Sequence, residues 1–251
     1  MNELQTNEFG NATSMLNQKK RPPKNAIVAC HMAFGSLAPN DRKMNLFDPL
    51  EHYPSNQCTH LYLSFSYYLL GFYHFTRENG PPAMNETLDY IQYIDKAKEL
   101  RSKLRNAGED PPLLIFSIGM LAIRDDHIMR ANNNEWHRVI GNDTLRHRLL
   151  QNLIAFALQL DLDGIDFAWT TFSTGWQNID RFSLLRLFLD SLNEHAQNVL
   201  PNSTKSLSFT MTLQADFFMK LIENNAFAQK SLPFSHITLV NNDFYNMDSD
   251  R

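Results

Sequence analysis

The octapeptide DGIDFAWT, at Asp163–Thr170, is the most informative part of this chain of 251 residues. Apolar residues alternate along it with small or polar ones, and together with the preceding leucine it predicts a strand over residues 162–169. Successive side chains of a strand point to opposite faces, so Asp166, Ala168 and Thr170 share one face. The intervening apolar residues share the other, which we expect to pack against helices. The face of Asp166 is therefore the candidate site.

Further strand-like and helical patterns alternate on both sides of this octapeptide. The other expected strands are residues 26–31, 59–66, 113–118, 207–213 and 236–240. Apolar residues recur every three or four positions in the intervening helices, which are expected over 88–104, from a cap at Asn142 or Asp143 to Leu160, and from about Asp180 to Leu192. A shorter fourth helix includes Leu221 and Ile222. Strands separated by helices of this length predict a parallel α/β sheet.

The absence of phosphate-binding loops favours a barrel over a doubly wound sheet. No GxGxxG and no GxxxxGK[ST] follows any expected strand. A complete barrel has eight strands, and residues 241–251 are all that follow the sixth expected one. We expect a disordered leader at residues 1–25 and an incomplete (β/α) barrel over 26–251, truncated at its C-terminus.

The charge balance excludes two classes of partner. The chain has 23 basic and 27 acidic residues, a net charge of -4, and no basic patch for nucleic acid or an anionic membrane. Its most apolar stretch, residues 61–75, is shorter than the roughly 20 residues of a membrane helix, so no membrane insertion is expected. Residues 1–25 lack an apolar segment of about 7 to 15 residues, so no signal peptide is visible.

The cysteines and the glycosylation sequons concern the cellular compartment in which the protein is found. Cys30 and Cys58 are the only cysteines, and by themselves they fit free thiols as well as a bridge. Asparagines at four Asn-X-Ser/Thr sequons are candidates for glycosylation; they are Asn11, Asn85, Asn142 and Asn202, of which we retain the last three.

The octapeptide resembles the signature DGxDxDxE of the family 18 glycoside hydrolases. Asp163, Gly164 and Asp166 match its first three fixed positions, whereas Ala168 and Thr170 stand in place of the third aspartate and the glutamate. In that family the glutamate protonates the leaving oxygen and the aspartate orients the acetamido group that acts as nucleophile. Neither alanine nor threonine can do this. The resemblance implies a vestigial active site with no catalytic residue.

Three other segments carry the same resemblance. CTHLYLSFS at residues 58–66 resembles the second strand of the family, LLIFSIG at 113–119 resembles the third, and residues 237–244 resemble the sixth. The likeness implies a (β/α)8 TIM barrel with about six of its eight strands, and a disulfide between Cys30 and Cys58. Ala168 followed by Trp169 resembles the insect imaginal disc growth factors, which are secreted chitinase-like proteins.

The implied function is a non-catalytic extracellular protein that binds chitin, N-acetylglucosamine oligomers or a cell-surface receptor, with no cofactor and no metal. The ligand-binding candidates are Phe65, Asp166 and Asp243, although Phe65 also fits a core position. His31 replaces a family aromatic residue, and because sugar rings pack on aromatic platforms we expect weak affinity.

Several alternatives stay open. A replacement acid such as Asp243 or Glu135 would make the protein a weakly active chitinase that hydrolyses β-1,4-N-acetylglucosamine linkages. The open edges of an incomplete barrel could instead pair with another chain. Asp163 and Asp166 also fit a structural role in capping backbone groups, and with Asp161 they lack the spacing of a calcium loop.

Overall fold

The computed structural model describes residues 27–34, 58–65, 72–82, 88–119, 137–169, 181–199, 206–214 and 234–240. The predicted leader at 1–25 and the predicted fourth helix lie outside these ranges. So do several candidate residues, which are Asn85, Glu135, Thr170, Asn202 and Asp243.

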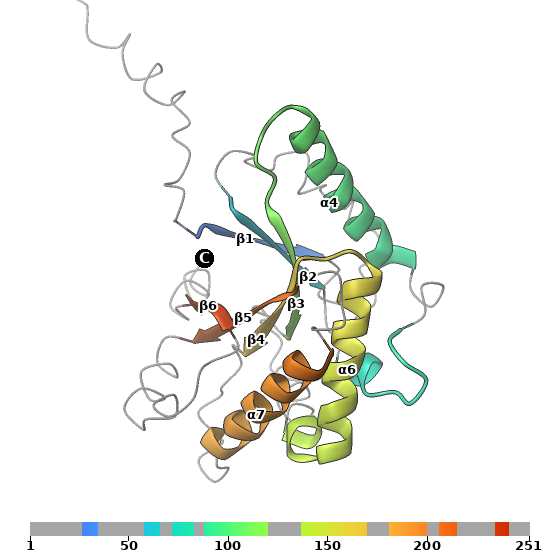
Figure 1. The fold of residues 1–251 in the computed structure, drawn as a ribbon, viewed down its shortest axis with the longest axis vertical. Coiled ribbons are helices and arrows are strands. Elements are labelled where there is room, and N and C mark those ends of the chain that lie inside the picture. Colours follow the sequence, from blue (N-terminus) through green and yellow to red (C-terminus); the bar gives the residue numbers. More distant parts are fainter. Residues whose placement is uncertain are drawn as a thin grey trace, which may run out of the picture.

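Six parallel strands form one sheet in the order in which they occur along the chain (Figure 1). They are β1 (Ala29–Phe34), β2 (His60–Phe65), β3 (Leu113–Gly119), β4 (Gly164–Trp169), β5 (Ser208–Gln214) and β6 (Phe234–Val240). Every neighbouring pair is parallel, which is the arrangement of a partial (β/α)8 barrel. The predicted fold class is confirmed, and β1 and β6 are the edges of the described sheet.

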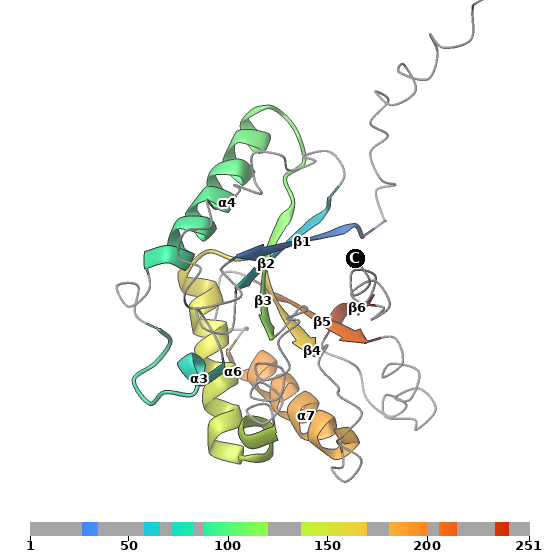
Figure 2. The same cartoon turned by 180° about the vertical axis from the view of Figure 1, so that it is seen from behind.

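The helices connect successive strands and cover one side of the sheet (Figures 1 and 2). They are α3 (Phe72–Phe75), α4 (Leu88–Asn106), α6 (Asp143–Gln159) and α7 (Arg181–Val199). The three long helices occur where the apolar period predicts them. The sequence did not predict α3, which lies at the end of the apolar stretch 61–75.

The first strand begins later than predicted. The expected range was 26–31, but β1 is Ala29–Phe34 because its backbone pairs with β2 from Ala29 opposite His60 to Phe34 opposite Phe65. Pairing therefore sets its bounds, whereas apolar content alone set the predicted ones.

The main hydrophobic core lies between the outer face of the sheet and the helices. Phe75 of α3, Phe116 of β3 and Phe156 of α6 pack with ring centroids 5.2–5.8 Å apart. Phe167 of β4 meets Phe188 of α7 edge to face at 4.8 Å. Each such side chain contributes roughly 1.5–3 kcal/mol when fully buried. This packing leaves the opposite, inner face free for a different set of residues.

Local contacts fix both ends of α6. The Asn142 side chain accepts a hydrogen bond from Leu145 N at 3.0 Å, so Asn142 is the N-cap. At the other end Asp161 adopts a left-handed conformation with φ 55°, and its carboxylate pairs with Arg101 of α4 at 2.7 Å. The cap predicted at Asn142 or Asp143 is thus Asn142, and α6 ends at Gln159, one residue before the predicted Leu160.

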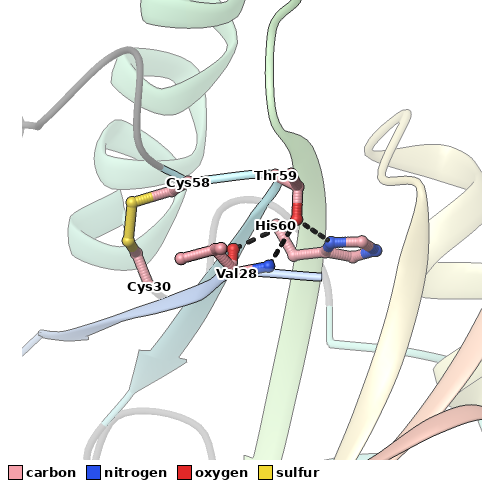
Figure 3. The surroundings of a disulfide bond; sticks show 5 residues. All are labelled: Val28, Cys30, Cys58, Thr59 and His60. Atoms are coloured by element: carbon pink, nitrogen blue, oxygen red, sulfur yellow. Dashed lines mark hydrogen bonds between the residues drawn. A yellow bond between two sulfur atoms is a disulfide. The ribbon is translucent and has the colours of Figure 1, made fainter. Parts of the chain in front are cut away.

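A disulfide joins β1 to the start of β2 (Figure 3). Cys30 and Cys58 are bonded, with Cα atoms 5.8 Å apart, as the family resemblance implies. Beside them Thr59 Oγ1 accepts from Val28 N at 2.8 Å, and Thr59 N donates to Val28 O at 2.9 Å. These contacts tie the edge strand β1 to the sheet.

Candidate functional site

Asp166 is fully buried at the centre of the inner face of the sheet. The parallel register places it between Ser117 of β3 and Thr210 of β5. Thr212 of β5 lies on the same face two residues further along, because side chains alternate along a strand. These three hydroxyl residues surround the Asp166 carboxylate.

Every described hydrogen bond to this carboxylate comes from a side-chain hydroxyl of the sheet. Asp166 Oδ2 accepts from Ser117 Oγ at 2.7 Å and from Thr212 Oγ1 at 3.0 Å. Asp166 Oδ1 accepts from Thr210 Oγ1 at 2.8 Å and again from Thr212 Oγ1 at 3.0 Å. The two oxygens are thus engaged by the protein itself.

Burial raises the pKa of the Asp166 carboxyl from 3.8 to about 6, because a charged carboxylate is poorly solvated there. The hydrogen bonds from Ser117, Thr210 and Thr212 lower the pKa and offset part of this effect. Asp166 is therefore an enclosed group whose charge depends on pH near neutrality.

Ala168 is the next inward residue of β4 and is 1% exposed. It lies between Gly119 of β3 and Thr212 of β5. Gly119 has φ 116°, and a Cβ there would be 2.1 Å from Ala168 O, so the two backbones approach as only glycine allows. The next inward side chain of β4 after Asp166 is therefore a buried methyl group.

The inner face continues over β2 and β1. The His31 ring stacks on Tyr62 with centroids 4.4 Å apart. Burial lowers the pKa of His31 to about 4, so its ring is neutral near pH 7. Both ring nitrogens, and Ser64 Oγ, are buried and have no hydrogen-bond partner among the described residues. His31 thus forms a buried, uncharged ring stack with Tyr62, at the position where the sequence suggested the loss of an aromatic residue.

Asp163 lies apart from Asp166, just before β4 begins. Its Oδ2 accepts from Leu114 N at 2.8 Å and from Arg101 of α4 at 3.0 Å. These contacts are the backbone-capping role weighed for Asp163 in the sequence, and they join α4 to the entry of β3 and β4.

The structure brings together only part of the predicted site. It places Asp166 and Ala168 on one face, and it adds Ser117, Thr210 and Thr212, which sequence reasoning missed. Alternation along β3 and β5 was the available signal, but only the register shows that these hydroxyls reach Asp166. Phe65 is the last residue of β2, and its part in ligand binding stays a prediction.

Within the described residues, no group of three His, Cys, Asp or Glu side chains is arranged to hold a metal ion. None of the helices in these ranges is both long and apolar enough to cross a bilayer.

Solved structures with the same fold are chitinases and chitinase-like proteins. The chitinase TsES1 of Trichuris suis has a TM-score of 0.54 and 16% identity, over 84% of this chain and 50% of that one. Human YKL-39, crystallised in the presence of chitooligosaccharides (GlcNAc4), has a TM-score of 0.53 and 18% identity over the same shares. The GH18 chitinase of Cycas revoluta has a TM-score of 0.51 and 16% identity, over 75% and 46%.

The fold is therefore a partial (β/α)8 barrel of the type found in GH18 chitinases. The chain spans about half the length of the solved structures it matches. No protein-family model matches the sequence, and no curated protein matches it closely.

Proposed function

We propose that this chain is a non-catalytic chitinase-like protein of the family 18 glycoside hydrolase type, which binds chitooligosaccharides. The observation that carries the proposal is the pairing of Asp166 with Ala168. The Asp166 carboxylate is enclosed by hydroxyl groups of the sheet. The next side chain on the same face of β4 is the buried methyl group of Ala168.

Hydrolysis of a glycosidic bond requires an acid that protonates the leaving oxygen and a second group that stabilises or attacks the sugar carbon. Asp166 is 0% exposed and accepts hydrogen bonds on both oxygens from the sheet, so its carboxyl is not presented to a substrate. Ala168 supplies no charge. By the signature resemblance Thr170 replaces the acid itself, and a threonine hydroxyl does not ionise near neutral pH.

Binding without hydrolysis has a parallel among proteins of this fold. YKL-39 is described as a pseudo-chitinase with retained chitooligosaccharide binding properties. In this chain we assign the ligand contacts to Phe65 and Asp243, which follow the resemblance to the second and sixth strands.

The disulfide supports an extracellular site of action, because such bonds persist in oxidising compartments. Glycosylation at Asn85, Asn142 and Asn202 belongs to the same proposal. At Asn142 the capping contact uses Oδ1, which leaves the exposed amide nitrogen for a glycan. A growth-factor-like role at a cell-surface receptor is the finer form of the proposal, and the Ala168-Trp169 pair is what supports it.

The test is a titration of the full chain with N-acetylglucosamine tetramer by calorimetry, run beside a fluorogenic chitooligosaccharide assay. We expect saturable binding that weakens in Phe65→Ala and no turnover above buffer. Absence of binding at millimolar ligand would overturn the sugar-binding half. Turnover that disappears in Asp243→Asn or Glu135→Gln would overturn the non-catalytic half and favour a weakly active chitinase.

A further inference from the structure

Two histidines from neighbouring helices face each other on the outer layer of the protein. His147 Nδ1 of α6 and His195 Nε2 of α7 are 2.9 Å apart, with ring centroids 5.1 Å apart. The His147 side chain is 34% exposed and His195 is half-buried, so solvent reaches the pair. This pair is remote in sequence from Asp166 and plays no part in the proposed sugar site.

A carboxylate stands behind one of the two rings. Asp143 Oδ1, one turn earlier in α6, lies 3.5 Å from His147 Nε2 and also accepts from the Arg146 guanidinium. A carboxylate on one ring nitrogen favours the proton there and leaves the other nitrogen with its lone pair free. Metal-binding histidines are oriented by this kind of partner. The lone pair of His147 Nδ1 then points at His195.

We propose that His147 Nδ1 and His195 Nε2 bind one divalent transition-metal ion, such as Zn²⁺, with water molecules as the remaining ligands. Imidazole nitrogens bind zinc at about 2.0–2.1 Å, so two of them in a tetrahedral shell lie roughly 3.3–3.4 Å apart. The observed 2.9 Å has to widen by only about 0.4 Å, which small side-chain rotations supply. Because no third protein ligand gathers among the described residues, the affinity is below that of a structural zinc site.

Metal binding changes the tautomer of His195. It releases no proton, because both rings are neutral before and after the metal binds. With the His147 proton on Nε2, beside Asp143, the two rings bond through His195 Nε2–H, which donates to His147 Nδ1; with the metal, the His195 proton resides on Nδ1. Burial lowers the pKa of His195, and the neighbouring His147 lowers it further, whereas Glu194 opposes this. The neutral, metal-binding form is thereby favoured.

The charged groups near the pair are the Asp143–Arg146 ion pair, which lies beside His147, and Glu194, which favours protonation of His195. Asp143 and Arg146 face it from α6, and Glu194 faces it from α7. Arg148, the next residue of α6, is paired with Glu78 at 2.8 Å. Protons compete with the metal for the same nitrogens, so binding must weaken as the pH falls below the ordinary histidine pKa of about 6.5.

The experiment is a calorimetric titration of the full chain, stripped with a chelator, with ZnCl₂ at pH 7.5 and at pH 5.5. We expect one ion per chain with a micromolar Kd at pH 7.5, and binding at least tenfold weaker at pH 5.5. His147→Gln and His195→Gln should each weaken binding at least tenfold. His60→Gln, which alters a histidine of β2 bonded to Thr59, is the matched control and should bind as the original chain does.

Thermal unfolding without metal establishes that each variant is folded, and zinc should raise the melting temperature of the original chain but not of either pair variant. If one variant unfolds, the other still decides, because loss of either ligand removes the site. Absence of saturable binding, or equal affinity in the original chain and a folded pair variant, would overturn the proposal. Asp143→Asn should keep the one-to-one stoichiometry with an affinity lowered several-fold, since it acts only by orienting His147.

Discussion

Replacement of Asp166 by asparagine tests whether burial or hydrogen bonding controls the enclosed carboxylate. Its pKa is raised from 3.8 to about 6, which means that the folded protein holds the proton more tightly than the unfolded chain does. Raising the pH through this interval therefore favours unfolding. A shift of about 2 pKa units corresponds to about 3 kcal/mol, since each unit is worth about 1.36 kcal/mol.

In the Asp166→Asn variant the side chain does not titrate, but it keeps nearly the same size. In the original chain, Asp166 should remove about 2–3 kcal/mol from the free energy of unfolding between pH 4 and pH 7. In Asp166→Asn that loss should vanish, so the stability difference, variant minus original, should rise with pH by the same amount. The hydrogen bonds of the asparagine amide differ from those of the protonated carboxyl, and this difference shifts the whole curve without changing its slope with pH.

The assay is urea unfolding, followed by circular dichroism, at half-unit steps from pH 4 to pH 7. Asp95→Asn, at an exposed position of α4, controls for the loss of a surface carboxylate. Thr212→Val removes one hydroxyl donor, so the midpoint of the Asp166 titration should move to higher pH. A flat difference for Asp166→Asn would refute the raised pKa, and a difference that falls with pH would mean that the hydroxyls outweigh burial.

Three further predictions concern stability. Gly119→Ala should cost about 3 kcal/mol or more, because its Cβ would meet a β4 carbonyl oxygen at 2.1 Å, whereas Gly108→Ala, at φ 73° with nothing within 4 Å, should cost only about 1 kcal/mol in the same urea assay. Reduction of the Cys30–Cys58 bridge should lower the free energy of unfolding by about 3–4 kcal/mol, given its separation of 28 residues; equal unfolding midpoints with and without reductant would contradict this. Arg101→Met should cost about 1–3 kcal/mol through its two aspartate partners, and a stability unchanged from that of the original chain would show that these ion pairs are not worth their desolvation.

Much of the fold could be predicted from the sequence because its signals are local. The alternation in 162–169 and the apolar period of 88–104 are properties of neighbouring residues, and the corresponding elements β4 and α4 form there. The first strand was misplaced by three residues because its bounds depend on pairing with β2, a contact between residues about thirty positions apart.

The candidate site was only half predictable. Asp166 and Ala168 could be assigned to one face from alternation alone. Their neighbours could not, because Ser117 is 49 residues before Asp166 and Thr210 is 44 residues after it. The disulfide was implied by family resemblance, whereas the spacing of two cysteines does not distinguish a bridge from free thiols.

The sequence by itself determined the class of structure, a parallel α/β chain, and the alternation that places Ala168 on the same face as Asp166. Only the tertiary structure decided what becomes of the remaining carboxylate. Strand register carries three hydroxyls to Asp166 and folding removes it from water, so its charge and its partners are set by residues that are distant along the chain. The same holds for His147 and His195, which meet because α6 and α7 pack side by side, a contact that neither helix encodes alone.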